Sequence, residues 1–464
     1  MIEKYYSGVI EQIYNRIGKE TRNIVMANYS NDFSIENLEV IRRYQSNEDN
    51  VFFAYSEFSY NTLVGAYEPF LDIICNMHRR FIGGSFDDFQ KECGVYYLHR
   101  QVLNSYYETG ECFREETVLL NEVAYEQRRM TMAIADMLKK LSEVKPLMIV
   151  INRFQMASKS SIETIKYLID NPCANIGIVL GVNAIVKGTD STVEVWDRIV
   201  ESLEDRSAIY YIGSAGPLKN NVKTTNDDEL YITMNFEQSI QEASNIMEFL
   251  DFEQARRGCR IIEHKLKFED AWIDEKSLRR FYMVYARTSV LLGEMSKAIE
   301  LTNEYKALIP ENDSEHYLSL YYFMKGTCYM YQGKLEKAGN SAKSAYDYAV
   351  LAEDDTLIFK AELLSVMIKM SGWYNIFFCV QDIPVSDEII EKLIKHGYRN
   401  HLAHIYIYAY DNSRDVVKQS FYDESLLKHF TKGLELAKEI GNEQLVYDAY
   451  QKTIMLASTS GLNE

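Results

Sequence analysis

Proline is scarce in this sequence, which has six prolines among 464 residues. Because proline lacks a backbone N–H and interrupts helices, its scarcity favours long helical stretches. The apolar runs are all much shorter than the roughly 20 residues that cross a bilayer, so we expect no membrane-spanning segment. The N-terminal residues lack a basic region followed by an apolar core, so we expect no secretory signal.

Paired cysteines are also lacking. The seven cysteines are odd in number and scattered along the chain, and no C-x-x-C motif joins two of them. This pattern is typical of free thiols in a reducing compartment, so the sequence predicts a cytoplasmic protein.

Positive charge is in deficit. The chain has 50 Lys and Arg residues against 68 Asp and Glu residues, which gives a formal net charge of −18. A strongly negative protein repels the phosphate backbone of nucleic acids, so we expect no direct nucleic-acid binding. The hydrophobic content of 47% with 25% charged residues is that of an ordinary globular protein.

Residues 1–215 combine short apolar runs with helical patterns. The runs are rich in β-branched or aromatic residues and are bounded by polar ones; they lie at 23–27, 50–55, 146–151, 176–182 and 208–212. Continuous apolar runs separated by helices predict a buried parallel sheet in an α/β domain. Residues 216–235, which are rich in Asn, Thr and Asp, predict a linker.

Residues 236–464 show helical periodicity almost throughout and contain an internal repeat. Four pairs of similar residues are each 40 positions apart: Tyr282 and Tyr322, Ala286 and Gly326, Gly293 and Gly333, and Ala298 and Ala338. Small residues are expected where two helices cross closely, and glycine is expected in the turn between them. We therefore predict tetratricopeptide-type helical hairpins that stack into an all-α superhelix. The alternative is a plain helical bundle without superhelical stacking.

Weaker copies of the repeat follow. One runs through residues 361–373, with Ser371-Gly372 near its turn. Another runs through residues 426–457, where we expect residues 433–442 to link two helices.

The segment 146–163 reads PLMIVINRFQMASKSSIE. It resembles the Walker B strand and following helix of the signal-transduction (STAND) ATPases that precede helical repeats, the maltose-activator-like, LuxR-type transcriptional regulators and their relatives. Residues 51–55 and 65–71 resemble the second strand of that family and the segment after it, and residues 176–183 resemble its sensor strand. The resemblance implies a P-loop-NTPase-like α/β domain at 1–215, followed by tetratricopeptide repeats at 236–464.

The phosphate-binding loop of such an ATPase needs glycines, a lysine and a Ser or Thr hydroxyl. The loop should follow the first predicted strand, where residues 28–37 contain neither glycine nor lysine. Asn28, Asn31 and Ser34 are polar side chains left at these vestigial positions. The sequence therefore predicts that the phosphate cradle has been lost.

The Walker B-like strand lacks its acidic pair as well. Asn152 and Arg153 occupy the positions of the carboxylates on which a Mg²⁺ site depends. Gln155 keeps a position where the family has Gln or His, and Asn183 follows the sensor strand. We predict a pseudo-NTPase without catalytic residues, nucleotide cofactor or metal. These polar residues either only hydrogen-bond strand ends, which we favour, or bind a nucleotide in an unconventional way.

A histidine cluster is the other candidate site. His396, His401 and His404 lie close together, but no carboxylate or cysteine lies among residues 395–404 to complete a metal site. We expect these histidines to serve packing or to lie on the surface.

These observations favour a regulatory or scaffold protein over an enzyme. The leading hypothesis is that residues 236–464 bind a protein or peptide partner, in signalling or in transcriptional regulation as the resemblance implies. The helix-turn-helix of the resembled family is not evident. The alternatives are a divergent ATP-binding switch ATPase and a regulator that binds DNA directly. The sequence leaves open the partner and whether the chain forms a homo-oligomer.

Overall fold

The computed structural model describes residues 2–29, 38–46, 50–59, 63–183, 186–189, 193–213, 223–225, 235–268, 273–312, 314–374, 387–409 and 424–459. The chain forms two compact units. The first contains residues 1–95, 99–113 and 126–272, and the second contains residues 96–98, 114–125 and 273–464. The helices at 236–268 thus belong to the first unit, whereas the sequence places a boundary before them. Most of the linker expected at 216–235 lies outside the described residues.

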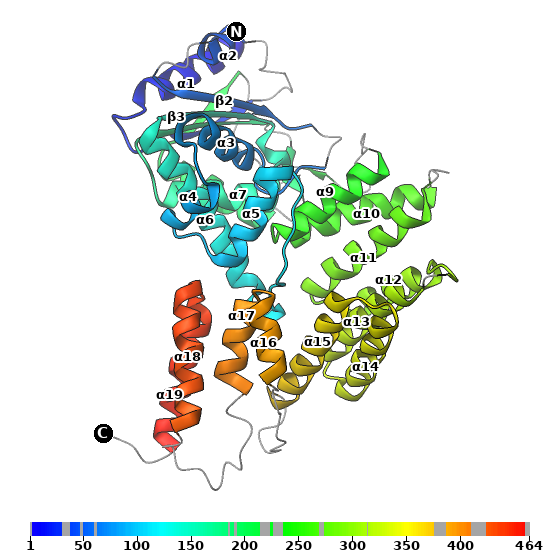
Figure 1. Cartoon of the computed structure of the whole chain (residues 1–464). Helices are drawn as coiled ribbons and strands as arrows, with labels where there is room; N and C mark the ends of the chain where they lie inside the picture. Colours follow the sequence, from blue (N-terminus) through cyan, green and yellow to red (C-terminus); the bar gives the residue numbers. More distant parts are fainter. Residues whose placement is uncertain are drawn as a thin grey trace. The chain divides into compact units, whose positions relative to one another are not determined.

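The first unit contains a five-stranded parallel sheet with the strand order β2-β3-β4-β1-β6 (Figure 1). Its strands are β1 (Ile24–Tyr29), β2 (Phe52–Glu57), β3 (Leu147–Asn152), β4 (Ile176–Asn183) and β6 (Ile209–Ile212). Each apolar run identified in the sequence forms one of these strands, so the prediction of a parallel α/β sheet is confirmed. A further parallel pair joins β5 (Val186–Thr189) and β7 (Lys223–Thr225).

Two N-terminal helices, α1 (Ile2–Arg16) and α2 (Glu39–Ser46), pack on one face of this sheet. Tyr6, Ile10 and Ile13 of α1 are fully buried in a cluster with alternate residues of the central strands. Because successive side chains of a strand point to opposite faces, Met148 and Val150 of β3 belong to this cluster. Burial on both faces explains why the strands are continuous apolar runs.

The other helices of the first unit lie along the chain in the following order. They are α3 (Phe70–Met77), α4 (Phe86–Glu92), α5 (Tyr97–Thr109), α6 (Val123–Val144), α7 (Lys159–Asp170), α8 (Val193–Glu204), α9 (Phe236–Glu248) and α10 (Phe252–Phe268), with the shorter η1 (His78–Ile82) and η3 (Phe154–Met156). The first residues of α5 and α6 belong to the second unit, as does η2 (Leu120–Glu122).

The second unit is mostly helical, which confirms the all-α character predicted for the C-terminal region. Its helices are α11 (Glu275–Leu291), α12 (Met295–Ala307), α13 (Glu315–Tyr331), α14 (Leu335–Leu351), α15 (Asp355–Tyr374), α16 (Asp387–Lys395), α17 (Arg399–His404), η6 (Ile405–Ala409), α18 (Glu424–Ile440) and α19 (Glu443–Thr459). Consecutive helices from α11 to α15 pack against each other (Figure 1).

The helix boundaries repeat with the period of the sequence. Helices α11 and α13 begin at 275 and 315 and end at 291 and 331, and α12 and α14 begin at 295 and 335, so each pair is offset by 40 residues. Gly293 and Gly333 lie in the three-residue turns, with φ of +78° and +70°. Their N–H groups donate to Val290 O and Met330 O, both at 2.9 Å, which is part of a Schellman cap. The turn chemistry therefore explains both glycines.

The predictions of a turn in each of the two weaker copies of the repeat are wrong. Ser371-Gly372 lies inside α15, and Gly433 lies inside α18. The link between α18 and α19 is only Gly441-Asn442, where Gly441 has a φ of +75°. Gly433 remains helical because its missing side chain leaves room for η6: a Cβ there would lie 2.8 Å from Ile407 Cγ1.

No helix in the part of the chain that the structure describes is long and apolar enough to cross a membrane. The described cysteines, Cys75, Cys93, Cys112, Cys173, Cys259 and Cys328, form no disulfide. Cys379 lies outside the described residues.

Candidate functional site

The vestigial nucleotide positions meet at the carboxyl edge of the sheet, the edge where open α/β sheets usually bind ligands. Asn28 lies near the end of β1, while Asn152 and Asn183 end β3 and β4. All three are buried, with 6% exposure or less. The sheet thus brings together residues that lie up to 155 positions apart in the sequence. Asn31 and Ser34, the other two loop positions, lie outside the described residues.

Asn152 is held by aromatic neighbours. The Tyr29 hydroxyl donates to Asn152 Oδ1 at 2.6 Å. Gly181, on the adjacent strand β4, leaves room for this amide, because a Cβ there would overlap Tyr6 Oη and lie 2.8 Å from Asn152 Oδ1. Burial, with Tyr29, Tyr55 and Glu57 nearby, raises the pKa of Tyr6 well above its usual value, so its phenol stays neutral. Protein side chains therefore pack over the end of the β3–β4 pair.

Arg153 forms an ion pair across to the neighbouring strand. Its Nη1 lies 3.0 Å from Glu57 Oε1 at the end of β2 and donates to Phe58 O at 3.3 Å. The Tyr55 hydroxyl donates to the same Glu57 carboxylate. Arg153 has a φ of +54°, a left-handed conformation that is uncommon outside glycine. The guanidinium at a Walker B-like position is thus already paired with a carboxylate of the protein itself.

The helix after β3 is capped by the protein. At the start of α7, the Ser158 hydroxyl accepts the N–H of Ser161. Just before this helix, Gln155 Oε1 accepts the backbone N–H of Asn183, at the end of β4, at 3.4 Å. Asp251, which is 5% exposed, accepts the N–H of Ser160 at 3.0 Å. A helix N-terminus attracts anions, and at α7 that anion is the Asp251 carboxylate. No local pattern could reveal this contact, because Asp251 follows Ser160 by 91 residues.

The eight residues of the predicted repeat differ in burial: four are buried, and the others are partly or fully exposed. Ala286, Ala298 and Ala338 are fully buried, and Gly326 is buried as well. A Cβ on Gly326 would lie 3.0 Å from Leu364 Cδ2 and 3.5 Å from Ala338 O, so α13, α14 and α15 approach closely there. Tyr282 and Tyr322 are partly exposed, and Gly293 and Gly333 are exposed in their turns.

Basic side chains lie over tyrosine rings throughout these hairpins. The pairs, with distances from the cation to the ring centroid, are Arg279 and Tyr317 (4.9 Å), Lys306 and Tyr321 (5.1 Å), Lys325 and Tyr321 (5.1 Å), Lys297 and Tyr285 (5.6 Å), and Lys337 and Tyr329 (5.9 Å). Such cation–π contacts place positive charge beside tyrosine rings, in a protein whose net charge is negative. Tyr317 and Tyr329 are partly exposed, whereas Tyr285 and Tyr321 are buried.

Two of the three clustered histidines, expected to serve packing or to lie on the surface, are buried in a carboxylate network. They are His401 and His404, whereas His396 is partly exposed and its ring stacks on Phe359. His401 Nδ1 lies 2.6 Å from Glu116 Oε1, and His404 Nε2 lies 2.9 Å from Glu122 Oε1. Their side chains are 4% and 7% exposed. Glu116 and Glu122 precede these histidines by more than 280 residues, so sequence proximity could not identify them as partners.

Two asparagines complete this network. The Asn442 amide donates to Glu122 Oε1 at 2.8 Å and to Asn400 Oδ1 at 2.7 Å, and Asn400 donates to Glu122 Oε2 at 3.0 Å. Burial alone raises the pKa of Glu122, but His404 and the two amides outweigh it and lower the pKa to about 2. The network holds the segment 114–125 to the helices α17 to α19.

No group of three or more His, Cys, Asp or Glu side chains is arranged to hold a metal ion among the residues that the structure describes. Comparison with known proteins adds no relative: no protein-family model, no curated protein and no solved structure matches this chain.

Proposed function

We propose that this chain is a non-catalytic regulatory or scaffold protein whose second unit binds a protein or peptide through tetratricopeptide-type repeats. The observation that carries the proposal is the equivalence of the α11–α12 and α13–α14 hairpins, which share a 40-residue offset, turn geometry and small residues at the helix crossings. A hairpin of this kind buries its apolar face only by stacking on another, and the stack presents an extended surface.

The chemistry of that surface favours a partner segment with carboxylates. Five Lys and Arg side chains lie over tyrosine rings in these hairpins, and two of the rings, those of Tyr317 and Tyr329, are partly exposed. Complementary charge speeds association and selects partners. A partner with acidic and apolar side chains can pair with the cations and pack on the partly exposed rings of Tyr317 and Tyr329.

The first unit supports a structural role better than a catalytic one. Asn152 is bonded to Tyr29, and Arg153 is paired with Glu57. ATP hydrolysis on a P-loop fold requires a metal carboxylate near the end of β3, and the residue there is an asparagine. The polar residues of this edge therefore join neighbouring strands.

One observation favours the second candidate, an ATP-binding switch. Strand β4, which resembles the sensor strand of the STAND class, lies between β1 and the Walker B-like strand β3, so the positions that resemble the nucleotide site of that class are neighbours in the sheet. Calorimetric titration of the full chain with ATP and ADP, with and without Mg²⁺, tests this candidate. Saturable, Mg²⁺-dependent binding would favour the switch over the scaffold.

Photo-cross-linking in the native host tests the scaffold itself. A photoreactive amino acid at the partly exposed Tyr322 of α13 is compared with one at Tyr5 of α1, which is 62% exposed and lies in the other unit. We expect a discrete cross-linked protein from position 322 and not from position 5. Binding of that protein, once purified, should be unaffected by ATP. No specific cross-link at 322 or at further hairpin positions would contradict the proposal.

A further inference from the structure

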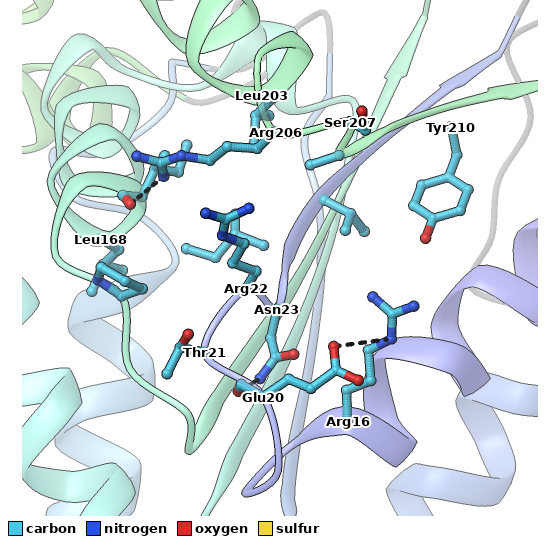
Figure 2. A pocket seen from close by; sticks show the side chains of 15 residues that line it. Arg16, Glu20, Thr21, Arg22, Asn23, Leu168, Leu203, Arg206, Ser207 and Tyr210 are labelled. Atoms are coloured by element: carbon cyan, nitrogen blue, oxygen red, sulfur yellow. Dashed lines mark hydrogen bonds and ion pairs between the residues drawn. The ribbon is translucent and has the colours of Figure 1, made fainter.

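A cavity of about 190 Å³ lies at the opposite, amino edge of the sheet, at the start of β1 and β6 (Figure 2). Three arginines, Arg16, Arg22 and Arg206, line it together with Thr21 and Ser207. This concentration of positive charge is unexpected in a chain with a net charge of −18. The function proposed above does not use this cavity.

The turn that carries Arg22 is held by a buried amide. Asn23 is fully buried, and its Nδ2 donates to Glu20 O at 2.5 Å and to Ala174 O at 3.2 Å. The backbone carbonyl of Asn23 accepts the N–H of Ile178 of β4 at 2.8 Å. The backbone of Thr21 and Arg22 is therefore fixed at the mouth of the cavity by contacts with two other segments.

The three arginines differ in how they are compensated. Arg16 Nε lies 3.6 Å from Glu20 Oε2. Arg206 donates to Ile169 O near the end of α7, and its Nη2 lies 4.0 Å from Asp170 Oδ1. The carbonyl contact of Arg206 is what the negative end of a helix would attract. Arg22, by contrast, makes no hydrogen bond or ion pair with any residue that the structure describes. Its guanidinium points toward the same side of the cavity as that of Arg206 (Figure 2).

Arg22 and Arg206 both line the cavity, and a bound anion would compensate the charge of Arg22, for which the described part of the chain supplies no partner. Glu20 is the acidic residue among those that line the cavity, and it already faces Arg16. A guanidinium without a partner, in a cavity lined by further arginines, can recognise phosphate through several N–H donors at once.

Ser207 adds a second, independent feature. It ends α8 with a φ of +52°, and its N–H donates to Glu204 O at 2.9 Å. This left-handed position is the one that glycine usually takes at the C-terminal end of a helix. Ser207 lines the cavity, and a hydroxyl there can donate to a phosphate oxygen.

We propose that this cavity binds a small phosphate monoester. Arg22 and Arg206 take the phosphate, with hydroxyl donors from Thr21 and Ser207. A short carbon skeleton packs on Leu168 and Leu203, two of the apolar residues of the lining. A cavity of about 190 Å³ has room for a phosphate group and a short carbon skeleton.

Calorimetric titration of the full chain with glycerol 3-phosphate tests the proposal. Inorganic phosphate and butyrate at matched ionic strength separate the contributions of the phosphate and of the carbon skeleton. We expect saturable binding of glycerol 3-phosphate, weaker binding of inorganic phosphate and little of butyrate. Arg22→Gln should weaken binding at least tenfold, while the control Arg198→Gln, on the exposed surface of α8, should leave it unchanged.

Hydrogen exchange locates the ligand and checks the fold. Glycerol 3-phosphate should slow exchange in residues 16–25 and 203–210, and Arg22→Gln should abolish this protection while its melting curve stays that of the wild type. The proposal is overturned by an absence of saturable binding, by protection elsewhere in the chain, by butyrate binding as tightly as the phosphates, or by equal affinities of Arg22→Gln and the wild type.

Discussion

Individual residues with uncommon backbone conformations mark the ends of helices in this protein. Gly293, Gly333 and Gly441 take the left-handed conformation after α11, α13 and α18, and Glu353 takes it after α14 with a φ of +52°. Glu353 closes the same hydrogen-bond pattern, since its N–H donates to Val350 O at 3.1 Å. A side chain in this conformation is strained where glycine is not.

Glu353→Gly should therefore stabilise the second unit. We expect a gain of about 1 kcal/mol, because relief of the strain outweighs the extra entropy of glycine in the unfolded chain. The exposed Glu353 side chain makes no ion pair that would be lost among the described residues. Thermal melting measures the effect, and Gly333→Glu at the equivalent turn should shift the midpoint the opposite way. Equal midpoints for Glu353→Gly and the wild type would contradict the prediction.

Glu242 of α9 is a carboxyl group whose protonation should affect stability. Burial, together with Glu68 and Asp72, raises the pKa of Glu242 to about 7, from a model-peptide value near 4.3. The folded protein then binds a proton more tightly than the unfolded chain does. Stability should therefore fall as the pH rises from about 4.3 to 7 and level off above that range.

Glu242→Gln should remove this dependence. The amide cannot ionise, so the variant should gain up to about 3 kcal/mol relative to the wild type at pH 8 and little at pH 4. Urea unfolding of both proteins across this pH range provides the measurement. A constant difference between the two curves at all pH values would argue against a perturbed Glu242.

Pairs of elements depend on small residues at their crossings. Ala338 is fully buried, and its carbonyl would lie 3.5 Å from a Cβ on Gly326, so no space remains for a larger side chain between α13 and α14. The neighbouring Gly339 is exposed, and a Cβ there would meet nothing within 4 Å. Within one turn of α14, position 338 thus has no room for a larger side chain, whereas position 339 has room for one.

Ala338→Phe should destabilise the hairpin by about 1–3 kcal/mol through overpacking. Gly339→Ala, the matched control, should instead stabilise α14 by up to about 1 kcal/mol, because alanine favours the helix. Melting and limited proteolysis of the full chain report both effects, and cleavage should increase first around α13 to α15. An unchanged melt for Ala338→Phe would mean that the crossing is not close.

The segment 114–125 depends on the buried pairs between its glutamates and the histidines of α17. Glu122→Gln removes the charge that faces His404, and we expect a loss on the order of 3 kcal/mol, since breaking a buried pair leaves its partner unsatisfied. Glu443→Gln is the control, because Glu443 accepts an exposed hydrogen bond from Tyr125 at 2.8 Å. Equal urea midpoints for the two variants would contradict a special role for Glu122.

At the scale of the whole molecule, the chain passes between the two units at 95–96, 98–99, 113–114, 125–126 and 272–273. A purely sequential division into domains cannot describe this arrangement. Two short segments from the α/β part of the sequence are counted within the helical unit, and α9 and α10 are counted within the α/β unit.

For the whole protein, we predict no ATP turnover above background. No carboxylate ends β3, and the amide of Asn152 is bonded to Tyr29. Phosphate release from the purified full chain with ATP and Mg²⁺ is the measurement. Asn152→Ala should leave partner binding unchanged; hydrolysis that Asn152→Ala abolishes would show that this edge is a working active site.

The sequence by itself determined the strands and the hairpin period of this protein. A strand buried on both faces must be apolar throughout, and the left-handed residue that ends a helix is preferably glycine. Both requirements leave local patterns in the sequence. The tertiary structure alone decided which distant residues meet. Glu122 reaches His404, Asp251 reaches α7, and Arg22 and Arg206 come to line one cavity, because these arrangements depend on how the elements pack rather than on any local spacing.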